Sequence, residues 1–218
     1  EKMVVYEPFP TVPLSEFHSE LRFEWPDLPV ELFDYYLLRT ATDMCRRAPL
    51  IHRRVRITLQ PGVTRYAVKS PDGMTMVAIT GLRHIPTGNE ECGSHQVPRS
   101  FSAPEHLCCA AGDKAWYDPD EEVLTLHLNQ GGVVAVDMSV VPAPTACVLP
   151  AAFRDELFPT LIMGTRAGIM LITGRPWTNL KVGGELYNEY NRMLGRAAVN
   201  RSLRKQRGIV KMNFGRAL

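Results

Sequence analysis

The sequence predicts an α+β protein: a helical bundle of about three main helices with an inserted antiparallel β-sandwich or barrel-like module and an extended C-terminal tail. Two observations lead to this prediction. Apolar residues recur at helical spacing before residue 50 and after residue 149, and they alternate with polar residues between these limits. We therefore divide the chain into N-terminal helices of the bundle (1–50), an inserted β domain (51–148), a helical hairpin (149–207) and an extended C-terminal docking tail (208–218).

The N-terminal helices begin with a short candidate at Leu14–Arg22. In the stronger helix that follows, we expect Asp27 to be the cap, Pro29 to lie in the first turn and Pro49 to end the helix. Its apolar residues fall on one stripe, which indicates a buried face; they are Val30, Phe33, Leu37, Ala41 and Met44.

Alternation of apolar and polar residues predicts the strands of the β domain. It covers Val55–Leu59, Tyr66–Val68 and Met74–Leu82, which are separated by turns that contain glycine or proline. The clearest strands are Leu124–Leu128 and Val134–Val140. Because a glycine pair lies between these two, we predict that they form a hairpin with one solvent-exposed face.

The C-terminal helices form the predicted hairpin. The first starts near Pro150 and is apolar on most sides, and Pro159 is expected to kink it or to mark a second start. The chain breaks at Thr173–Trp177. A second helix, increasingly basic, then runs from about Asn179 until Gly208 ends it.

Small residues in the first hairpin helix predict close helix packing. Gly164, Ala167 and Gly168 lie about one turn apart. A glycine inside a helix costs roughly 1 kcal/mol in helix propensity, and the close approach of another helix would compensate for this cost. Trp177, in the break between the helices, is expected to anchor the turn in the core.

Charge is unevenly distributed along a chain whose formal net charge is +2. Glu1–Asp34 holds eight acids and two bases, a net charge of −6, whereas Arg192–Leu218 holds eight bases and no acid. This asymmetry indicates end-to-end self-association or two different partners for the two ends. Two solvated ends are the alternative.

We find no secretory signal and an odd number of cysteines, and we expect reduced thiols in a protein folded in the cytosol. The five cysteines are Cys45, Cys92, Cys108, Cys109 and Cys147. The best candidate for a membrane span, Leu161–Ile172, is too short and contains Arg166, so no membrane contact is expected.

The segment Ile85–Lys114 is expected to be a long protruding loop. It contains residue types that bind zinc, but their spacing matches no established zinc pattern, and we favour free loop side chains: Cys92, His95, His106, Cys108 and Cys109. The acidic run Asp118–Glu122 lacks the glycine and the spaced oxygen ligands of a calcium loop, so we interpret it as a solvated turn. We therefore expect no metal and no cofactor.

Motifs of the common catalytic classes are absent from the sequence, including the nucleophile elbow, the P-loop, the dinucleotide fingerprint and the zinc-protease helix. His127 falls on the outward face of a strand and has no identifiable partner for general-base catalysis. We therefore expect no enzymatic activity and assign no catalytic residue.

The basic C-terminal segment has two interpretations. Lysine and arginine neutralise nucleic-acid phosphates, yet no interleaved aromatic residues support base stacking. We favour a docking tail that inserts into a protein partner, with Phe214 and Leu218 as anchors. The candidate docking residues are Arg201, Arg204, Lys205, Arg207, Lys211, Phe214, Arg216 and Leu218.

Several segments together resemble the head-to-tail adaptor proteins of tailed bacteriophages, called tail tubular protein A or gatekeeper proteins in short-tailed phages. The most specific part is the break Gly174-Arg175-Pro176-Trp177-Thr178-Asn179 with its flanking helices. The same pattern includes the Leu149-Pro150 start, the helix with Gly164 and Ala167, the following helix with Tyr187, Tyr190 and Asn191, and the first long helix from Leu37-Leu38-Arg39 to Arg47.

The resemblance implies a homo-oligomeric ring, usually of twelve copies, beneath the portal at one capsid vertex. It implies that the C-terminal segment contacts the portal protein, while the β module faces the tail nozzle or tail tube protein and possible fibres. Genomic DNA would pass through the ring with non-specific contacts. The protein would assemble in the host cytoplasm and reside in the virion at the head–tail junction.

Two other functions stay open. The basic tail would suit a nucleic-acid-binding accessory protein, whose affinity would depend steeply on salt. The Cys/His-containing loop would suit a zinc-dependent enzyme, for which stoichiometric zinc in the purified protein is the requirement.

Overall fold

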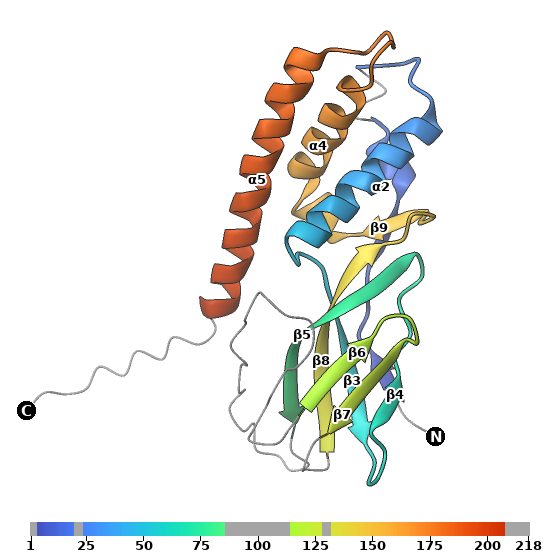
Figure 1. Ribbon diagram of the computed structural model, residues 1–218, viewed down its shortest axis with the longest axis vertical. Helices are drawn as coiled ribbons and strands as arrows, with labels where there is room; N and C mark the ends of the chain where they lie inside the picture. The colour runs from blue at the N-terminus through green and yellow to red at the C-terminus, as the bar shows by residue number, and fades with distance from the viewer. Residues whose placement is uncertain (1–3, 20–23, 86–113, 128–131, 208–218) are drawn as a thin grey trace, which may run out of the picture.

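The computed structural model describes residues 4–19, 24–85, 114–127 and 132–207 (Figure 1). The chain is a mixed α+β protein with antiparallel sheets. The long helices gather at one end of the molecule and most strands at the other (Figure 1). Within the described residues the sheets are open, and none closes into a barrel.

The largest sheet has four antiparallel strands in the order β1-β3-β8-β5. Its strands are β1 (Val4–Tyr6), β3 (His52–Leu59), β5 (Met74–Ile85) and β8 (Gly132–Pro142). β8 lies in the middle, and residues that point to both of its faces are buried, for example Val136 and Ala135. The edge strand β5 carries two register shifts, next to Val77 and Thr80. Such bulges make a sheet edge a poorer template for further pairing.

Two smaller sheets complete the strand pairing. β4 (Arg65–Ala67), β7 (Val123–His127) and β6 (Lys114–Asp118) form a three-stranded sheet in the order β4-β7-β6. β2 (Thr11–Pro13) pairs with β9 (Val148–Pro150). The N-terminal segment therefore contributes strands to two sheets, one in the β region and one at the base of the hairpin.

The expected hairpin between Leu124–Leu128 and Val134–Val140 is wrong. β7 pairs with β4 and β6, whereas β8 pairs with β3 and β5. The expected wet face is wrong too, because α2 lies against β8 and most of its side chains are buried. The alternation identified both strands correctly, but it carries no information about which long-range partner each strand selects.

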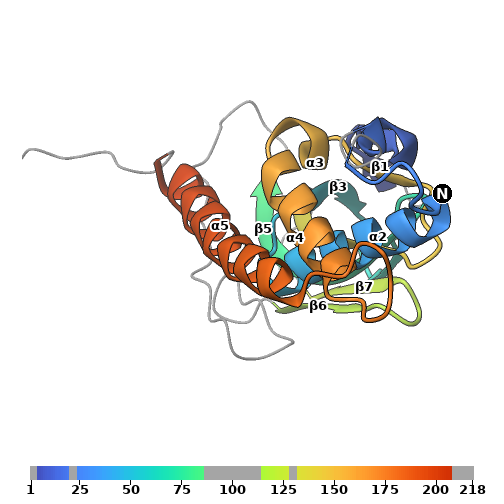
Figure 2. The same ribbon diagram turned by 90° about the horizontal axis from the view of Figure 1, so that it is seen from above.

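The helices that the structure describes in full are α2 (Val30–Arg47), α3 (Ala152–Asp155), α4 (Phe158–Met170) and α5 (Leu180–Arg207), preceded by the short 3₁₀ helix η1 (Leu14–Phe17). Figure 2 shows α4 between α2 and α5. One continuous core joins the helices to the strands, and its largest fully buried side chains include Phe17, Leu37, Met44, Tyr66, Met138, Phe153 and Tyr190.

Three details of the expected helices differ from the structure at least in part. The helix expected at Leu14–Arg22 begins as a 3₁₀ turn at Leu14–Phe17; Ser19 is helical, and residues 20–22 lie outside the described residues. Asp27 does not cap α2: the residue before the helix is Pro29, and its carbonyl accepts the Leu32 and Phe33 N–H groups at 3.1 Å. Pro150 ends strand β9 rather than starting a long helix.

The first hairpin helix is divided into two pieces. α3 ends at Asp155 and α4 starts at Phe158, with Pro159 in its first turn. Proline suits this position because the first N–H groups of a helix have no partner within it. Of the two expectations for Pro159, the second helix start is therefore the one observed.

Candidate assembly site

Side chains of the same chain fill the space beside the predicted helix-packing glycines. A β-carbon at Gly164 would lie 2.6 Å from Thr40 Cγ2 and 2.8 Å from Tyr190 Cδ2. A β-carbon at Gly168 would lie 2.6 Å from Tyr36 Cδ1. All three separations are shorter than a carbon–carbon contact allows. The absence of side chains at Gly164 and Gly168 therefore lets α2 and α5 pack closely on α4.

Tyr190 is the polar link between α5 and α2. Its side chain is buried, and its hydroxyl donates a hydrogen bond to Asp43 Oδ2 at 2.6 Å. Burial and the hydrogen bond to this carboxylate raise the pKa of Tyr190 well above its ordinary value of about 10. Arg47 adds a second connection, because its Nη1 donates to Asn191 Oδ1 at 2.7 Å and lies 3.2 Å from Asp43 Oδ2.

The break between α4 and α5 is organised by its own polar residues. The Thr178 hydroxyl donates to the Ile172 carbonyl and accepts the Arg175 N–H at 2.9 Å. Asn179 caps α5, since its Oδ1 accepts the Val182 N–H at 3.1 Å. These bonds fix the turn, so the glycines at the start of α5 do not delay the helix.

Trp177 lies in this turn and is partly buried against the core. It is therefore less enclosed than a residue in the centre of the core. Its indole Nε1 is shielded from solvent, and no hydrogen-bond partner for it exists in the part of the chain that the structure describes. Trp177 thus contributes apolar contact area rather than a polar anchor.

The candidate docking residues divide into two groups. Arg201, Arg204, Lys205 and Arg207 fall within the last turns of α5. Lys211, Phe214, Arg216 and Leu218 lie outside the described residues. The structure therefore shows that a helix leads into the basic terminus, and docking by this segment stays a prediction.

The acidic N-terminal segment forms ion pairs with the rest of the chain. Glu7 pairs with Arg56 at 2.9 Å, Glu16 with Arg154 at 3.0 Å and Glu24 with Arg166 at 3.1 Å. Asp34 lies 2.7 Å from His18. Much of the negative charge that suggested a partner is thus used to tie this segment to β3 and to α3 and α4, and less of it is left for an external cation.

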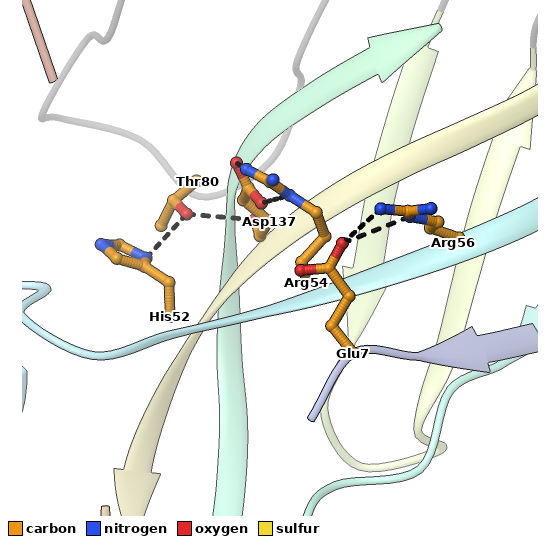
Figure 3. A network of polar contacts seen from close by, with 6 residues as sticks. All are labelled: Glu7, His52, Arg54, Arg56, Thr80 and Asp137. Atoms are coloured by element: carbon orange, nitrogen blue, oxygen red, sulfur yellow. Dashed lines mark hydrogen bonds and ion pairs between the residues drawn. The ribbon is translucent and has the colours of Figure 1, made fainter. Parts of the chain in front are cut away.

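A polar network on the four-stranded sheet escaped sequence analysis (Figure 3). Asp137 on β8 accepts two hydrogen bonds from Arg54 on β3, at 2.6 and 3.1 Å. The hydroxyl of Thr80 donates to the Asp137 carbonyl and lies 3.0 Å from His52 Nδ1. Arg54 and Asp137 are direct cross-strand partners. Their opposite charges would have been a usable signal only if the pairing of β3 with β8 had been known.

Glycine 81 makes room for this network. A β-carbon at Gly81 would lie 3.2 Å from Asp137 Oδ2, which is tighter than an ordinary contact. The hydrogen bond to Asp137 raises the pKa of Arg54, so the guanidinium stays charged. The Arg54–Asp137 pair therefore ties β3 to β8, and the Thr80 hydroxyl ties the bulged strand β5 to the backbone of the same Asp137.

The structure offers no metal centre among the residues it describes. Asp118 Oδ1 accepts the backbone N–H groups of Asp120 and Glu121, and Glu122 Oε1 accepts the Ser70 N–H at 3.1 Å. The acidic turn therefore uses its oxygens internally. The cysteines and histidines of the candidate zinc loop lie outside the described residues.

The structure also shows the surroundings of His127 and of two of the five cysteines. The ring of His127 stacks on Trp116 with 5.1 Å between ring centres. Cys45 is buried and Cys147 is exposed, and no disulfide joins either of them to another described residue. No helix in the described part of the chain combines the length and the apolar character that crossing a membrane requires.

Comparison with known proteins adds no assignment. No protein-family model matches the chain, and no curated protein matches it. The candidate site is therefore described by its geometry alone. It is a layer of helices that pack closely at glycines, and its long edge helix α5 leads into the basic C-terminal sequence.

Proposed function

We propose that the protein is a structural virion component, a head-to-tail adaptor that forms a ring, expected to be dodecameric, between the portal and the tail. In this proposal its fold is a helical bundle with an inserted β-sandwich module. The carrying observation is the hairpin of α4 and α5 around the Pro176-Trp177 break, the segment in which the resemblance to adaptor proteins is most specific.

Three further observations support the proposal. The long helices and most of the strands lie at opposite ends of the molecule, so two different partners can be contacted at once (Figure 1). Helix α5 is an edge helix of 28 residues, roughly 42 Å long, that leads into the basic C-terminal sequence. The polar groups of the sheet network are paired with one another, as expected for a scaffold.

The roles follow from this arrangement. The basic C-terminal segment from Arg201 to Leu218 docks on the portal protein, and the β region faces the tail. Genomic DNA passes through the ring and is contacted without sequence preference. No reaction is catalysed, and the protein works by holding its partners in register.

Mass photometry of the purified protein, with and without its portal ring, tests the proposal. The expected result is a discrete mass shift of about twelve times 24.5 kDa on the portal. Deletion of residues 208–218 is expected to abolish this shift. A protein that never associates with the portal under any salt condition would refute the adaptor function.

Nucleic-acid binding is the second candidate, favoured by the eight bases and no acids of Arg192–Leu218. On β3, Arg54 and Arg56 are paired with Asp137 and Glu7, and Arg53 lies over the Tyr6 ring, so these arginines are less available to phosphates. Binding would therefore depend on the C-terminal segment. A steep fall in DNA affinity with rising salt, lost on deletion of 208–218, would support this candidate, and a flat salt response would exclude it.

A further inference from the structure

Most of the arginines whose side chains the structure describes form ion pairs within the chain. They are Arg47, Arg54, Arg56, Arg65, Arg154, Arg166 and Arg192. Arg39 and Arg46 on α2 differ from them. Both are exposed, and neither has an ion-pair partner among the described residues. Their charges are therefore available to a partner.

Arg39 and Arg46 lie on the side of α2 that points away from the core. An α-helix turns by about 100° per residue, so each arginine is about 200° around the axis from a fully buried residue two positions earlier, Leu37 or Met44. Tyr35, which is 57% exposed, falls within about 40° of both arginines. We call this surface the outer face of α2; it consists of Tyr35, Arg39 and Arg46.

The acidic residues of α2 do not neutralise the outer face. Asp34 and Asp43 are hydrogen-bonded to side chains outside the helix. Glu31 lies in the first turn, eight residues before Arg39, which is about 12 Å along the helix axis. The two arginines therefore keep their positive charge uncompensated by the helix that carries them.

The outer face belongs to a helix whose position is fixed. The opposite side of α2 is buried in the core, and Asp43 is bound by Tyr190 of α5. The Arg39 guanidinium lies over the Tyr36 ring, 5.9 Å from its centre, a contact that leaves the N–H donors of the guanidinium unused. Figure 2 shows α2 and α5 on opposite sides of α4, so the hairpin leaves the outer face accessible.

The chemistry of the outer face favours a DNA backbone over a protein partner. The centre of a protein–protein interface is apolar and poor in charged residues, whereas protein–DNA interfaces are polar and positively charged. The outer face presents two guanidinium groups and a phenol hydroxyl, which donate hydrogen bonds that phosphate oxygens accept. No large aliphatic side chain of α2 is exposed beside them.

We propose that the outer face of α2 contacts the phosphate backbone of double-stranded DNA without reading its sequence. Arg39 and Arg46 are seven residues apart, about 10.5 Å along the helix, whereas phosphates follow one another every ~3.4 Å along a DNA strand. The two arginines therefore bind different phosphates. This inference rests on the proposed function, in which the C-terminal segment docks on the portal and DNA in the channel is contacted by another surface.

The salt dependence of DNA affinity, measured on the full chain with short duplexes of two unrelated sequences, tests the outer face. The double variant Arg39→Gln/Arg46→Gln is expected to bind both duplexes roughly tenfold more weakly at low salt. The slope of log affinity against log salt should fall by about 2, because each phosphate contact contributes about 0.9. The C-terminal segment is present in every variant, so its contribution is common to all. Both substitutions are at exposed positions, and circular dichroism checks that the variant folds.

Arg56→Gln/Arg154→Gln is the matched control. It removes the same two positive charges from exposed side chains, at 53% and 47% exposure, but both arginines are held in ion pairs. This variant is expected to change the slope by less than about 1. If both double variants lower the slope equally, binding follows net charge alone. That result, or a wild-type protein that does not bind DNA at low salt, would overturn the inference.

Mass photometry with the portal ring separates this inference from the proposed function. Arg39→Gln/Arg46→Gln is expected to add the same mass to the portal as the wild type does. Loss of the mass shift in this variant alone would show that the outer face makes a protein contact, and would overturn the inference. If the wild type also fails to add mass to the portal, the adaptor function is refuted, and the DNA affinities still decide for or against the outer face.

Discussion

Gly164 of α4 lies directly against the ring of Tyr190 of α5, and a β-carbon at Gly164 would approach the ring to 2.8 Å. Because Tyr190 is held by Asp43 on α2, this one contact joins all three long helices. The ring is enclosed and hydrogen-bonded, so it has little freedom to move away from an added methyl group.

Gly164→Ala is expected to destabilise the protein, although alanine is the better helix former. Overpacking against Thr40 and Tyr190 costs about 1–3 kcal/mol, whereas Gly195→Ala, which meets open space, gains up to about 1 kcal/mol. Because the gain in helix propensity is common to both substitutions, the two variants should differ by the overpacking cost, about 1–3 kcal/mol. Urea unfolding at low protein concentration, where association contributes little, measures the difference. Equal stabilities would show that α4 can shift to accommodate the methyl group.

Tyr190→Phe is expected to cost about 1–2 kcal/mol, because it removes the hydrogen bond to Asp43 and keeps the ring. Asp43 retains Arg47 and some solvent, which keeps the loss at the lower end for a charged acceptor. Tyr187→Phe, on the exposed side of the same helix, is the control and should change stability by less than about 0.5 kcal/mol.

The same tyrosine predicts a loss of stability at high pH. The pKa of Tyr190 is raised in the folded protein, so the folded state holds the hydroxyl proton more tightly than the unfolded state does. Its contribution is fully present below the ordinary tyrosine pKa of about 10 and declines as the pH rises above that value. Unfolding followed between neutral pH and pH values above about 10 should show a smaller decline in Tyr190→Phe than in the wild type. Parallel declines would exclude Tyr190 as the titrating group.

Arg54→Met is expected to lower stability more than Arg56→Met does. Arg54 binds Asp137 through two hydrogen bonds at a partly buried site, whereas the Arg56–Glu7 pair is more exposed. Loss of Arg54 leaves a partly desolvated carboxylate and should cost about 1–3 kcal/mol. Loss of Arg56 should cost about 0–1 kcal/mol. Thermal unfolding of both variants at the same ionic strength makes the comparison, and a reversed order would contradict it.

Trp177→Ala is expected to destabilise the protein, and Trp177→Phe is not. A fully buried tryptophan would cost about 3–5 kcal/mol on truncation; because Trp177 is only partly buried, we expect a smaller loss. Phenylalanine keeps most of the apolar contact and removes an indole N–H that has no partner among the described residues. Differential scanning calorimetry of both variants tests this. A strong destabilisation by phenylalanine would reveal a polar role for the indole.

Local sequence patterns predicted the positions of the strands better than they predicted which strands pair with each other. The strands at Val55–Leu59 and Met74–Leu82 were expected from alternation, and they are confirmed within β3 and β5. The hairpin between the later strands was wrong, because adjacency in sequence does not establish adjacency in a sheet. The cap of α2 was misplaced by two residues, because the residue before the helix is Pro29, whose carbonyl accepts the Leu32 and Phe33 N–H groups, and no side chain caps the helix.

The sequence predicted which glycines of the candidate site allow close helix packing, but it did not predict which side chains pack against them. Gly164 and Gly168 stood out because a helix interior penalises glycine. Their partners Thr40, Tyr36 and Tyr190 come from segments on both sides of them in the chain, and no spacing rule connects these positions. The Arg54–Asp137 network was missed for the same reason, since its two residues are 83 positions apart.

The sequence by itself determined where most of the helices and strands form and where glycine is needed, because periodicity and backbone preference act within a few residues of each position. Only the tertiary structure decided which strands share a sheet and which glycines have side chains of the same chain packed against them. Both outcomes depend on contacts between distant segments. Nothing in the sequence distinguishes the surroundings of Gly164 from those of Gly195. In the fold, one is enclosed by Tyr190, and the other faces open space on the edge of α5.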